Sequence, residues 1–390
     1  MRSRLAAAVV LPLAVSVLSG CGLGNGVSKS PDPAAVVPAW QRLPDPPLDP
    51  RSGPAVAWTG SDVLVAGGDT SDPCPANADC AQPAHFARDG ARLDVGTRSW
   101  HAIADAPVDV PAYSSQALVG DRWFVLAGRV LLAYDVPRDS WSQVPTPVSL
   151  RGGQLVASGD ELVVAAGSDE HGVTPDRVYD TTSERWSTLP DDPIGPAFDR
   201  AITAIPNGLV LTAHELVDNP GADGPSLVLA ARYDRATNSW TRLPDSDQLG
   251  GWAWTWTGRR LVDVSLGGAD GGEVGNYGRT IPFGGILDPT TGSWSRLPHA
   301  PPGPGHGWAV AALGGRFAAV DGWTYDDDSR SWAEVPTPDG APKQPGAAVW
   351  ADDRLVVIGG IDARRGDAAG SLSGHAWISA SGETLGRPLQ

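Results

Sequence analysis

Short apolar segments alternate with turn-forming residues along most of the chain. Apolar residues 55–59 are followed by Gly60-Ser61-Asp62, by a second apolar run at residues 63–66, and by Gly67-Gly68. The same order recurs at residues 154–167, 252–268 and 347–360. Each run has the length of a strand, and Gly, Asn, Asp and Ser favour tight turns. Each of these segments therefore predicts a β-hairpin.

A second periodic pattern predicts another hairpin in the same unit. An aromatic residue or leucine is followed by aspartate and, seven positions after the first residue, by tryptophan, with turn residues between them. The six pairs are Leu93 and Trp100, Tyr134 and Trp141, Tyr179 and Trp186, Tyr233 and Trp240, Leu287 and Trp294, and Tyr325 and Trp332. Trp40, in WQRLP, carries only the end of the pattern.

Together the two hairpins define a four-stranded unit that occurs seven times. The first hairpins turn at Gly60, Gly120, Gly159, Asn207-Gly208, Gly258, Gly314 and Asp352-Asp353. Repeats of about 40–50 residues, each too small to bury both of its faces, predict an all-β, seven-bladed β-propeller of four-stranded antiparallel blades. A β-helix has shorter repeats, and tandem sandwiches lack one repeated unit. We expect the Trp40 strand, rather than residues 383–389, to complete the seventh blade and leave no open edge.

The diglycine after the second strand and the aromatic–Asp–Trp spacing resemble the kelch repeat of the galactose oxidase-like superfamily over residues 40–390. The diglycine is intact at Gly67-Gly68, Gly267-Gly268 and Gly359-Gly360, and it is altered at Ala213-His214 and Asp321-Gly322, among others. The resemblance is specific for fold and not for activity, because function resides in sites grafted onto folds. A galactose oxidase-like copper site would need a cysteine cross-linked to tyrosine, whereas Cys74 and Cys80 lie together in one segment. We therefore expect no metal and no cofactor.

The N-terminal region predicts export and lipid anchoring. Arg2 and Arg4 precede an apolar run and the sequence LSGC, which is the order of a signal peptide and resembles the lipobox of bacterial lipoproteins. Residues 1–20 are then a lipoprotein signal peptide, Cys21 is the lipidation site, residues 21–38 are a flexible tether, and residues 39–390 form the propeller. The expected location is the outer face of the cell membrane.

The remaining cysteines and the net charge limit the chemistry further. Cys74 and Cys80 are expected to form a disulfide, because an oxidising compartment favours pairing and a zinc site lacks two further ligands. The formal net charge of −16 argues against nucleic acid and against anionic membrane surfaces, both of which attract clustered Lys and Arg. Contact with the membrane is then expected through the lipid anchor only.

The long connections, which should share one face of the ring, are the expected location of a site. Aligning the first strands brings five cations to the central mouth on that face: Arg51, Arg151, Arg200, His306 and Lys343. Such a cluster predicts a site for an anionic glycan or for an acidic peptide or protein. The alternative is that each cation pairs with a carboxylate in a neighbouring loop, such as Asp49, Asp199 or Asp245.

Tryptophans on the first strand of the fifth unit offer a second binding feature. Trp252, Trp254 and Trp256 alternate and therefore share one side of the strand, where they either stack on a sugar or pack between blades. Trp252 lies at the mouth, and Trp308 aligns with it one blade later, which favours an aromatic rim.

Two functions of different classes follow from these features. The first is a surface-anchored, non-catalytic binding or scaffold protein that recognises a glycan, peptide or protein through its loop face. The second is an extracytoplasmic carbohydrate-active enzyme, either a sugar epimerase or mutarotase or a lyase, with Glu170-His171 and His214-Glu215 as the acid–base candidates. The chain shows no nucleophile, metal or cofactor motif, which favours binding.

Overall fold

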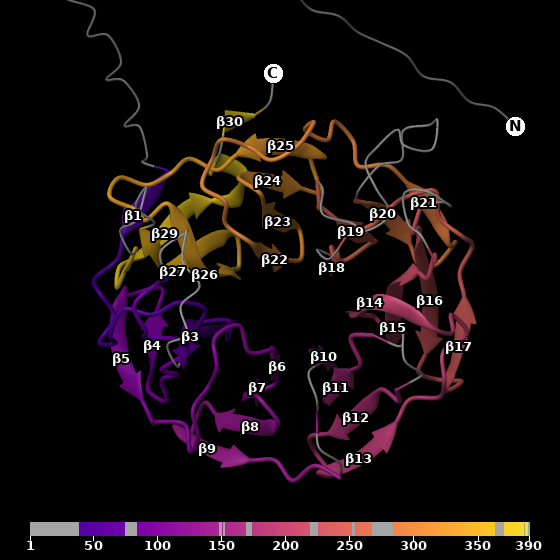
Figure 1. Cartoon of the computed structure of the whole chain (residues 1–390), viewed down its shortest axis with the longest axis horizontal. Coiled ribbons are helices and arrows are strands. Elements are labelled where there is room, and N and C mark those ends of the chain that lie inside the picture. Colours follow the sequence, from indigo (N-terminus) through magenta and orange to yellow (C-terminus); the bar gives the residue numbers. More distant parts are fainter. Residues whose placement is uncertain are drawn as a thin grey trace, which may run out of the picture. The chain divides into compact units, whose positions relative to one another are not determined.

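Seven four-stranded antiparallel sheets stand in a ring about a central axis in the computed structural model (Figure 1). The structure describes residues 39–74, 84–147, 150, 153–168, 174–218, 225–251, 254–266, 284–362, 370–385 and 387–388. The predicted all-β, seven-bladed propeller is therefore confirmed.

The blades are numbered by the order of their first, innermost strands. Blade 1 contains β2 (Ala55–Trp58), β3 (Asp62–Ala66), β4 (Gly90–Asp94) and β5 (Ser99–Ile103). Blade 2 contains β6 (Gln116–Val119), β7 (Arg122–Ala127), β8 (Val130–Asp135) and β9 (Ser140–Gln143). Blade 3 contains β10 (Gln154–Ser158), β11 (Glu161–Ala165), β12 (Arg177–Asp180) and β13 (Arg185–Thr188). Blade 4 contains β14 (Ala197–Ile205), β15 (Gly208–Glu215), β16 (Val228–Asp234) and β17 (Ser239–Arg242).

Blades 5 to 7 continue the ring. Blade 5 contains β18 (Trp254–Trp256), β19 (Leu261–Asp263), β20 (Gly285–Asp288) and β21 (Ser293–Ser295). Blade 6 contains β22 (Ala312–Gly314), β23 (Phe317–Val320), β24 (Trp323–Asp326) and β25 (Ser331–Glu334). Blade 7 contains β26 (Gln344–Ala351), β27 (Arg354–Asp362), β29 (Ala376–Ser381) and β1 (Trp40–Arg42). Three short elements are added: β28 (Ser371–Leu372) beside β27, the 3₁₀ turn η1 (Gly382–Thr384), and β30 (Arg387–Pro388).

The repeated tryptophans connect each blade to the one before it. Each indole N–H donates to a backbone carbonyl at the end of the previous blade's outer strand, over 2.6 to 3.0 Å. The seven bonds join Trp40 to Pro336, Trp100 to Pro44, Trp141 to Ala104, Trp186 to Pro145, Trp240 to Pro190, Trp294 to Pro244, and Trp332 to Pro298. This closed tryptophan belt uses the same acceptor position, four residues after tryptophan, in every blade; the residue there is proline in six blades and alanine in the other.

The aromatic–Asp–Trp spacing sets the second hairpin as the sequence predicts. Tyr134 lies opposite Trp141 and Tyr179 lies opposite Trp186 in the strand register, with ring centroids 5.0 Å apart in both pairs. The intervening aspartate accepts bonds from backbone N–H groups of the turn, as Asp180 does from Ser183 at 2.8 Å. The pattern therefore positions one capped turn in each of these hairpins, and it adds an aromatic pair where the first residue is tyrosine.

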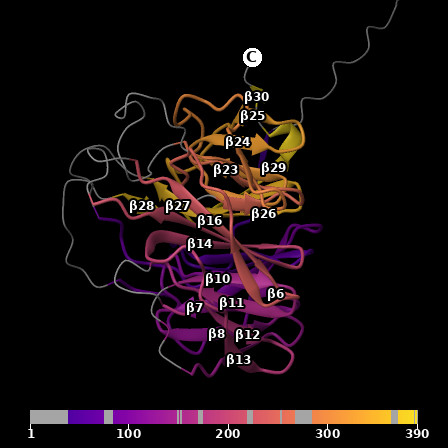
Figure 2. The same cartoon turned by 90° about the vertical axis from the view of Figure 1, so that its right-hand side faces the viewer.

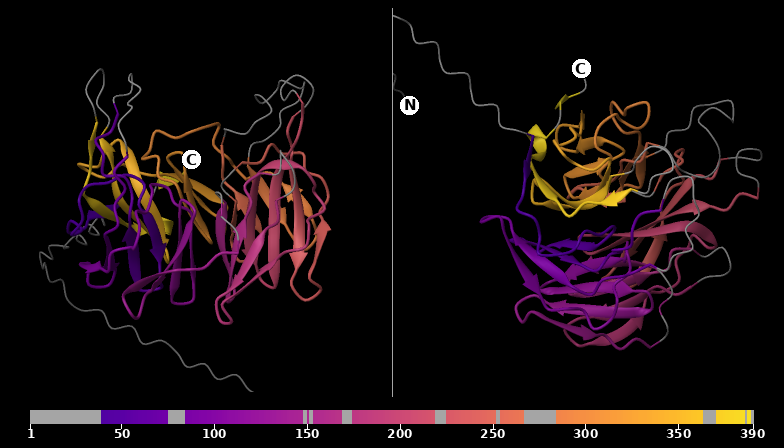
Figure 3. Two further views of the ribbon diagram at one scale, coloured as in Figure 1. Left: turned by 60° about the horizontal axis from the view of Figure 1, so that its bottom comes forward. Right: turned by 60° about the vertical axis from the view of Figure 1, so that its left-hand side comes forward.

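The N-terminal strand closes the ring, as expected. β1 pairs with β29 in antiparallel register, with Trp40 opposite Ser379, and the indigo start of the ring lies beside the yellow sheet at its end (Figures 1 and 3). One buried apolar cluster joins Val63 and Leu93 of blade 1 to Val356 and Ile378 of blade 7. Neither end of the propeller therefore leaves an apolar sheet face uncovered.

The C-terminal segment differs from the sequence interpretation. Residues 383–389 were expected as a degenerate end of the seventh unit, whereas β30 pairs with β25 and adds a fifth strand to blade 6 (Figure 2). The outer strand of blade 7 is already β1, so the C-terminal residues pair with the exposed edge of the neighbouring blade instead.

Candidate functional site

A cavity of about 280 Å³ opens at the end of the ring where the first strands of blades 1, 6 and 7 begin. Connections between successive blades end on this face, which we call the loop face; the short turns within hairpins lie on the opposite, turn face (Figure 3). The described residues that line the cavity are Ser52, Gly53, Pro54, Tyr113, Ala309, Ala311, Gln344, Pro345, Gly346, Ala347, Ala348, Gly360 and Ile361.

The walls of this cavity are small and uncharged. Most of the lining residues are glycine, alanine or proline, so much of the surface is backbone. Among the described lining residues, Tyr113 is the only one with an ionisable side chain. Ser52 and Gln344 add one hydroxyl and one amide. The cavity suits an uncharged group better than an anion.

Tyr113 is the most unusual residue of the site. Its side chain is 82% exposed, and its backbone φ is +59°, a conformation that a bulky residue rarely adopts. Its N–H donates to the carbonyl of Gly53 at 2.7 Å. A Cβ on Gly53 would lie 3.0 Å from the Tyr113 ring, so the glycine allows the ring to approach the backbone. Strain held in place by neighbours, on an exposed aromatic side chain beside a cavity, is typical of a binding position.

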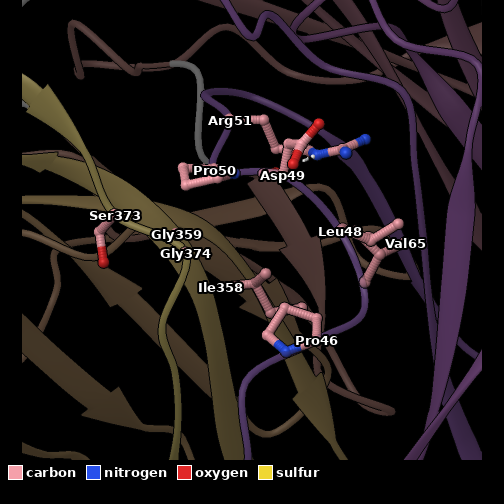
Figure 4. A pocket seen from close by; sticks show the side chains of 10 residues that line it. All are labelled: Pro46, Leu48, Asp49, Pro50, Arg51, Val65, Ile358, Gly359, Ser373 and Gly374. Carbon is pink, nitrogen blue, oxygen red and sulfur yellow. Dashed lines mark hydrogen bonds between the residues drawn. The ribbon is translucent and has the colours of Figure 1, made fainter.

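Arg51 is engaged inside blade 1. Its side chain is buried, and it forms a bidentate pair with the Asp89 carboxylate at 2.6 and 3.0 Å. It also donates to the backbone carbonyl of Asp49, as Figure 4 shows, and to that of Gly67. The adjacent pocket, lined by apolar side chains such as Leu48 and Ile358, measures about 10 Å³. That volume holds about one water molecule, so it offers no room for an anionic ligand.

Arg200 is engaged in the same way in the neighbourhood of blades 3 and 4. It is 5% exposed and donates to Asp176 at 3.1 Å and to Asp192 at 2.8 Å. For both arginines the structure therefore shows the alternative weighed from the sequence, pairing with a nearby carboxylate, although the partners are not those expected. Neither guanidinium is available at the channel mouth.

The other predicted cations have different surroundings. His306 is exposed, and its backbone N–H donates to the Glu334 carboxylate at 2.9 Å. Lys343 is exposed and directly precedes Gln344, which lines the cavity. Arg151 and Trp252 lie outside the described residues.

The expected aromatic rim is wrong for Trp308. This side chain is 1% exposed, donates to the Pro342 carbonyl at 2.9 Å, and packs edge-to-face against Trp40 and Trp377. Trp254 and Trp256 belong to an apolar cluster shared with blade 4. Trp308 precedes β22 and is not part of a regular strand. Its alignment with Trp252 in the sequence therefore does not determine which way its side chain points.

Of the acid–base candidates, only His214 and Glu215 lie among the described residues. His214 is buried, stacks on Phe198, and bonds through Nε2 to the Leu249 carbonyl at 2.7 Å. Glu170 and His171 lie outside the described residues. No group of three His, Cys, Asp or Glu side chains in the described ranges could hold a metal ion.

The N-terminal and cysteine predictions depend largely on residues outside the described structure. Cys74 is disulfide-bonded, but Cys80 lies outside the described residues, so their pairing stays a prediction. Cys21 and the tether also lie outside them. In the described part of the chain, no helix is long and apolar enough to cross a membrane.

Sequence reasoning missed Tyr113 because it searched for charge. The chain has six tyrosines, and four of them occupy the repeated position before aspartate. Tyr113 stands outside the repeat, immediately before a first strand, in a segment that begins with proline. An aromatic residue that breaks a repeat was the available signal.

Comparison with known proteins adds no family. The sequence matches no model of a protein family and no curated protein. The kelch-type pattern is therefore a resemblance, whereas the propeller fold rests on the structure.

Proposed function

We propose that the protein is a non-catalytic binding protein whose loop face holds a glycan, peptide or protein partner at the mouth of the channel. In this proposal a lipid on Cys21 anchors it to the outer face of the cell membrane. The propeller fold is consistent with a binding or scaffold role, because it presents a rigid face with a central opening.

The observation that carries the proposal is the exposed Tyr113 beside an open, uncharged cavity. A bulky residue at positive φ costs about 1–3 kcal/mol, and the surrounding backbone holds Tyr113 in this conformation, because its N–H donates to the Gly53 carbonyl at 2.7 Å. The described lining residues supply no carboxylate, imidazole or amine, the groups that most often act as general acids and bases. This composition favours binding over catalysis.

The test is a screen of the full-length protein in detergent against neutral and acidic glycans and against peptides. Each hit is measured on the parent, on Tyr113→Ala, and on Arg98→Ala, a control that changes an exposed positive-φ residue on the turn face. Loss of an aromatic contact at the site should weaken binding about tenfold in Tyr113→Ala only. Hits that bind both variants with the affinity of the parent would overturn the proposal.

One observation keeps the enzyme hypothesis open. Burial raises the pKa of the Asp321 carboxyl, which stands at an altered diglycine on the loop face. A carboxyl with raised pKa is suited to donate a proton. Monitoring the screened sugars by NMR for epimerisation or cleavage, with Asp321→Asn as the variant, tests catalysis directly; turnover that this variant abolishes would favour the enzyme.

A further inference from the structure

The cavity meets the edge of a strand rather than its face. Five consecutive residues of β26, from Gln344 to Ala348, line the cavity. Side chains of a strand point alternately to opposite faces, so consecutive residues can share one cavity only along the edge of the strand. Gly346, Ala347 and Ala348 are small, which leaves the backbone of this edge accessible.

The hairpin register identifies the backbone groups that point into the opening. Ala351 lies opposite Arg354 and closes a two-residue turn at Asp352-Asp353. The residues that flank such a turn form a hydrogen-bonded pair, and bonded and non-bonded pairs then alternate along an antiparallel ladder. Counting back through the continuous register from Ala351 to Ala347, Ala348 directs its N–H and C=O groups away from β27.

In blades 3 and 4, side chains accept hydrogen bonds from the inner edge of the first strand and so cap it. The N–H of Leu155 donates to Ser115 Oγ, and the N–H of Ile202 donates to Gln154 Oε1, both at 2.8 Å. Leu155 and Ile202 occupy the position in their own strands that Ala348 occupies in β26. Each of the three lies three residues before the last residue of the strand, which precedes the hairpin turn. In both cases the acceptor comes from the preceding blade.

Blade 6 provides no such cap for blade 7. The position of Ser115 and Gln154 is occupied there by Val310, which is fully buried and has no side-chain acceptor. Among the described residues, no side chain or backbone group outside β27 accepts from or donates to the Ala348 backbone. The inner edge is therefore open at the cavity, while it is capped at the Leu155 and Ile202 positions of blades 3 and 4.

We propose that the cavity binds an extended, uncharged peptide segment that adds as a strand to the open edge of β26. This inference rests on the proposed binding function and names its ligand class. A peptide supplies a backbone C=O to accept from the Ala348 N–H and a backbone N–H to donate to the Ala348 C=O. The small walls accommodate small side chains, and Tyr113 provides an apolar face for a proline or aliphatic residue.

A peptide fits these contacts better than a sugar. A sugar ring presents several hydroxyl groups, and sites that distinguish sugars need polar side chains placed to pair with them. The described lining residues carry only three polar side chains, those of Ser52, Gln344 and Tyr113. The dominant polar surface of the cavity is main chain, which favours a ligand with a complementary main chain.

The experiment uses an array of random decapeptides without charged residues, and the best binder is resynthesised with single N-methyl groups along its backbone. N-methylation removes one backbone donor at a time. Strand addition predicts an alternating result: methylation at every second residue across the bound segment weakens binding by about tenfold or more, and methylation between them has little effect. A uniform or absent effect contradicts strand addition.

Two matched variants test the edge on the protein. Ala348→Pro removes an N–H that is not in the ladder, and proline is tolerated on such an edge. Ala157→Pro makes the same change on the inner edge of β10, where the N–H of Ala157 also points away from the neighbouring strand. Both variants should melt close to the parent, and only Ala348→Pro should lose peptide binding, by about tenfold or more.

The outcomes separate this inference from the proposed function. If only glycans bind, and Tyr113→Ala weakens them, the proposed function stands and the peptide inference fails. If peptides bind with equal affinity to Ala348→Pro and the parent, strand addition is wrong. If neither glycans nor peptides depend on Tyr113, both proposals fail.

Discussion

At the scale of single residues, Arg200 is buried and Tyr113 is exposed, and the two residues have different roles. Arg200 is buried between Asp176 and Asp192, so its charge stabilises the structure. Tyr113 keeps most of its ring in solvent beside the cavity. Arg51 and Arg200 are therefore structural, whereas the uncharged Tyr113 is the candidate contact.

Replacing Arg200 by alanine should destabilise the protein. The substitution leaves two buried carboxylates without their cation, and breaking a buried pair in this way typically costs about 3–5 kcal/mol. Urea denaturation of the parent and of Arg200→Ala measures the difference; Arg185→Ala, an exposed arginine of blade 3, is the control. Equal midpoints for all three proteins would contradict the structural role.

The turn aspartates should make stability depend on acid. The backbone N–H of Ser183, and then that of Thr182, lower the pKa of Asp180, and the N–H of Thr97 lowers that of Asp94. Because the folded pKa lies below the unfolded value of about 3.9, this stabilisation is present above that pH and is lost as the pH falls through the folded pKa.

The variant Asp180→Asn isolates one of these turns, since asparagine keeps the acceptor oxygen but does not titrate. The parent should be more stable than the variant at pH 7, and the gap should narrow as the pH falls below about 3.9 and close below the folded pKa of Asp180. Thermal melts of both proteins between pH 7 and pH 2.5 measure it. A gap that stays constant over this range would show that the charge of Asp180 does not contribute.

The sequence predicted the position of a residue correctly where that position depends on residues nearby in the chain. The tyrosine–tryptophan register and the aspartate turns depend on neighbours within seven residues, so the repeat alone predicts them. Asp89, the partner of Arg51, lies 38 residues away, and Asp176 and Asp192, the partners of Arg200, lie 24 and 8 residues away, so these pairs depend on how loops fold over the blade. Trp308 was misplaced for the same reason, because its indole bonds to Pro342 of the next blade.

At the scale of elements, β1 holds the ring closed. It supplies the outer strand of blade 7, the Trp40 donor to Pro336, and the Pro44 acceptor for Trp100. β30, in contrast, adds a fifth strand to a blade that is already complete. The sequence predicted β1 because its WQRLP segment repeats the motif of the other outer strands. It did not predict β30, because a strand of two residues has no recognisable pattern.

Deleting residues 39–44 should therefore lower the melting temperature by more than about 5 °C, because two bonds of the tryptophan belt and one strand are lost together. Deleting residues 387–390 is the matched control and should change it by about 2 °C or less. Scanning calorimetry on both truncated proteins measures this. If deleting residues 39–44 lowered the melting temperature no more than deleting residues 387–390 does, the ring would not need β1.

At the scale of the whole molecule, the proposed attachment to the membrane depends on Cys21. Cys21→Ser should abolish lipid attachment, so that the protein is released into the medium or keeps its signal peptide. Detergent-phase partitioning and the mass of the mature N-terminus measure both results. Unchanged partitioning of this variant into the detergent phase would contradict lipidation at Cys21.

The most direct test of the central claim, that the loop-face cavity is the binding site, is hydrogen–deuterium exchange of the full-length protein with and without its best ligand from the screen. Binding at the cavity should slow exchange in residues 344–348, where the inner edge of β26 is open, and in residues 52–54 and 113 beside it. The turns at residues 136–139 and 181–184 on the turn face should be unchanged. Protection confined to the turn face, or bound ligand with no protection in residues 344–348, would contradict the account.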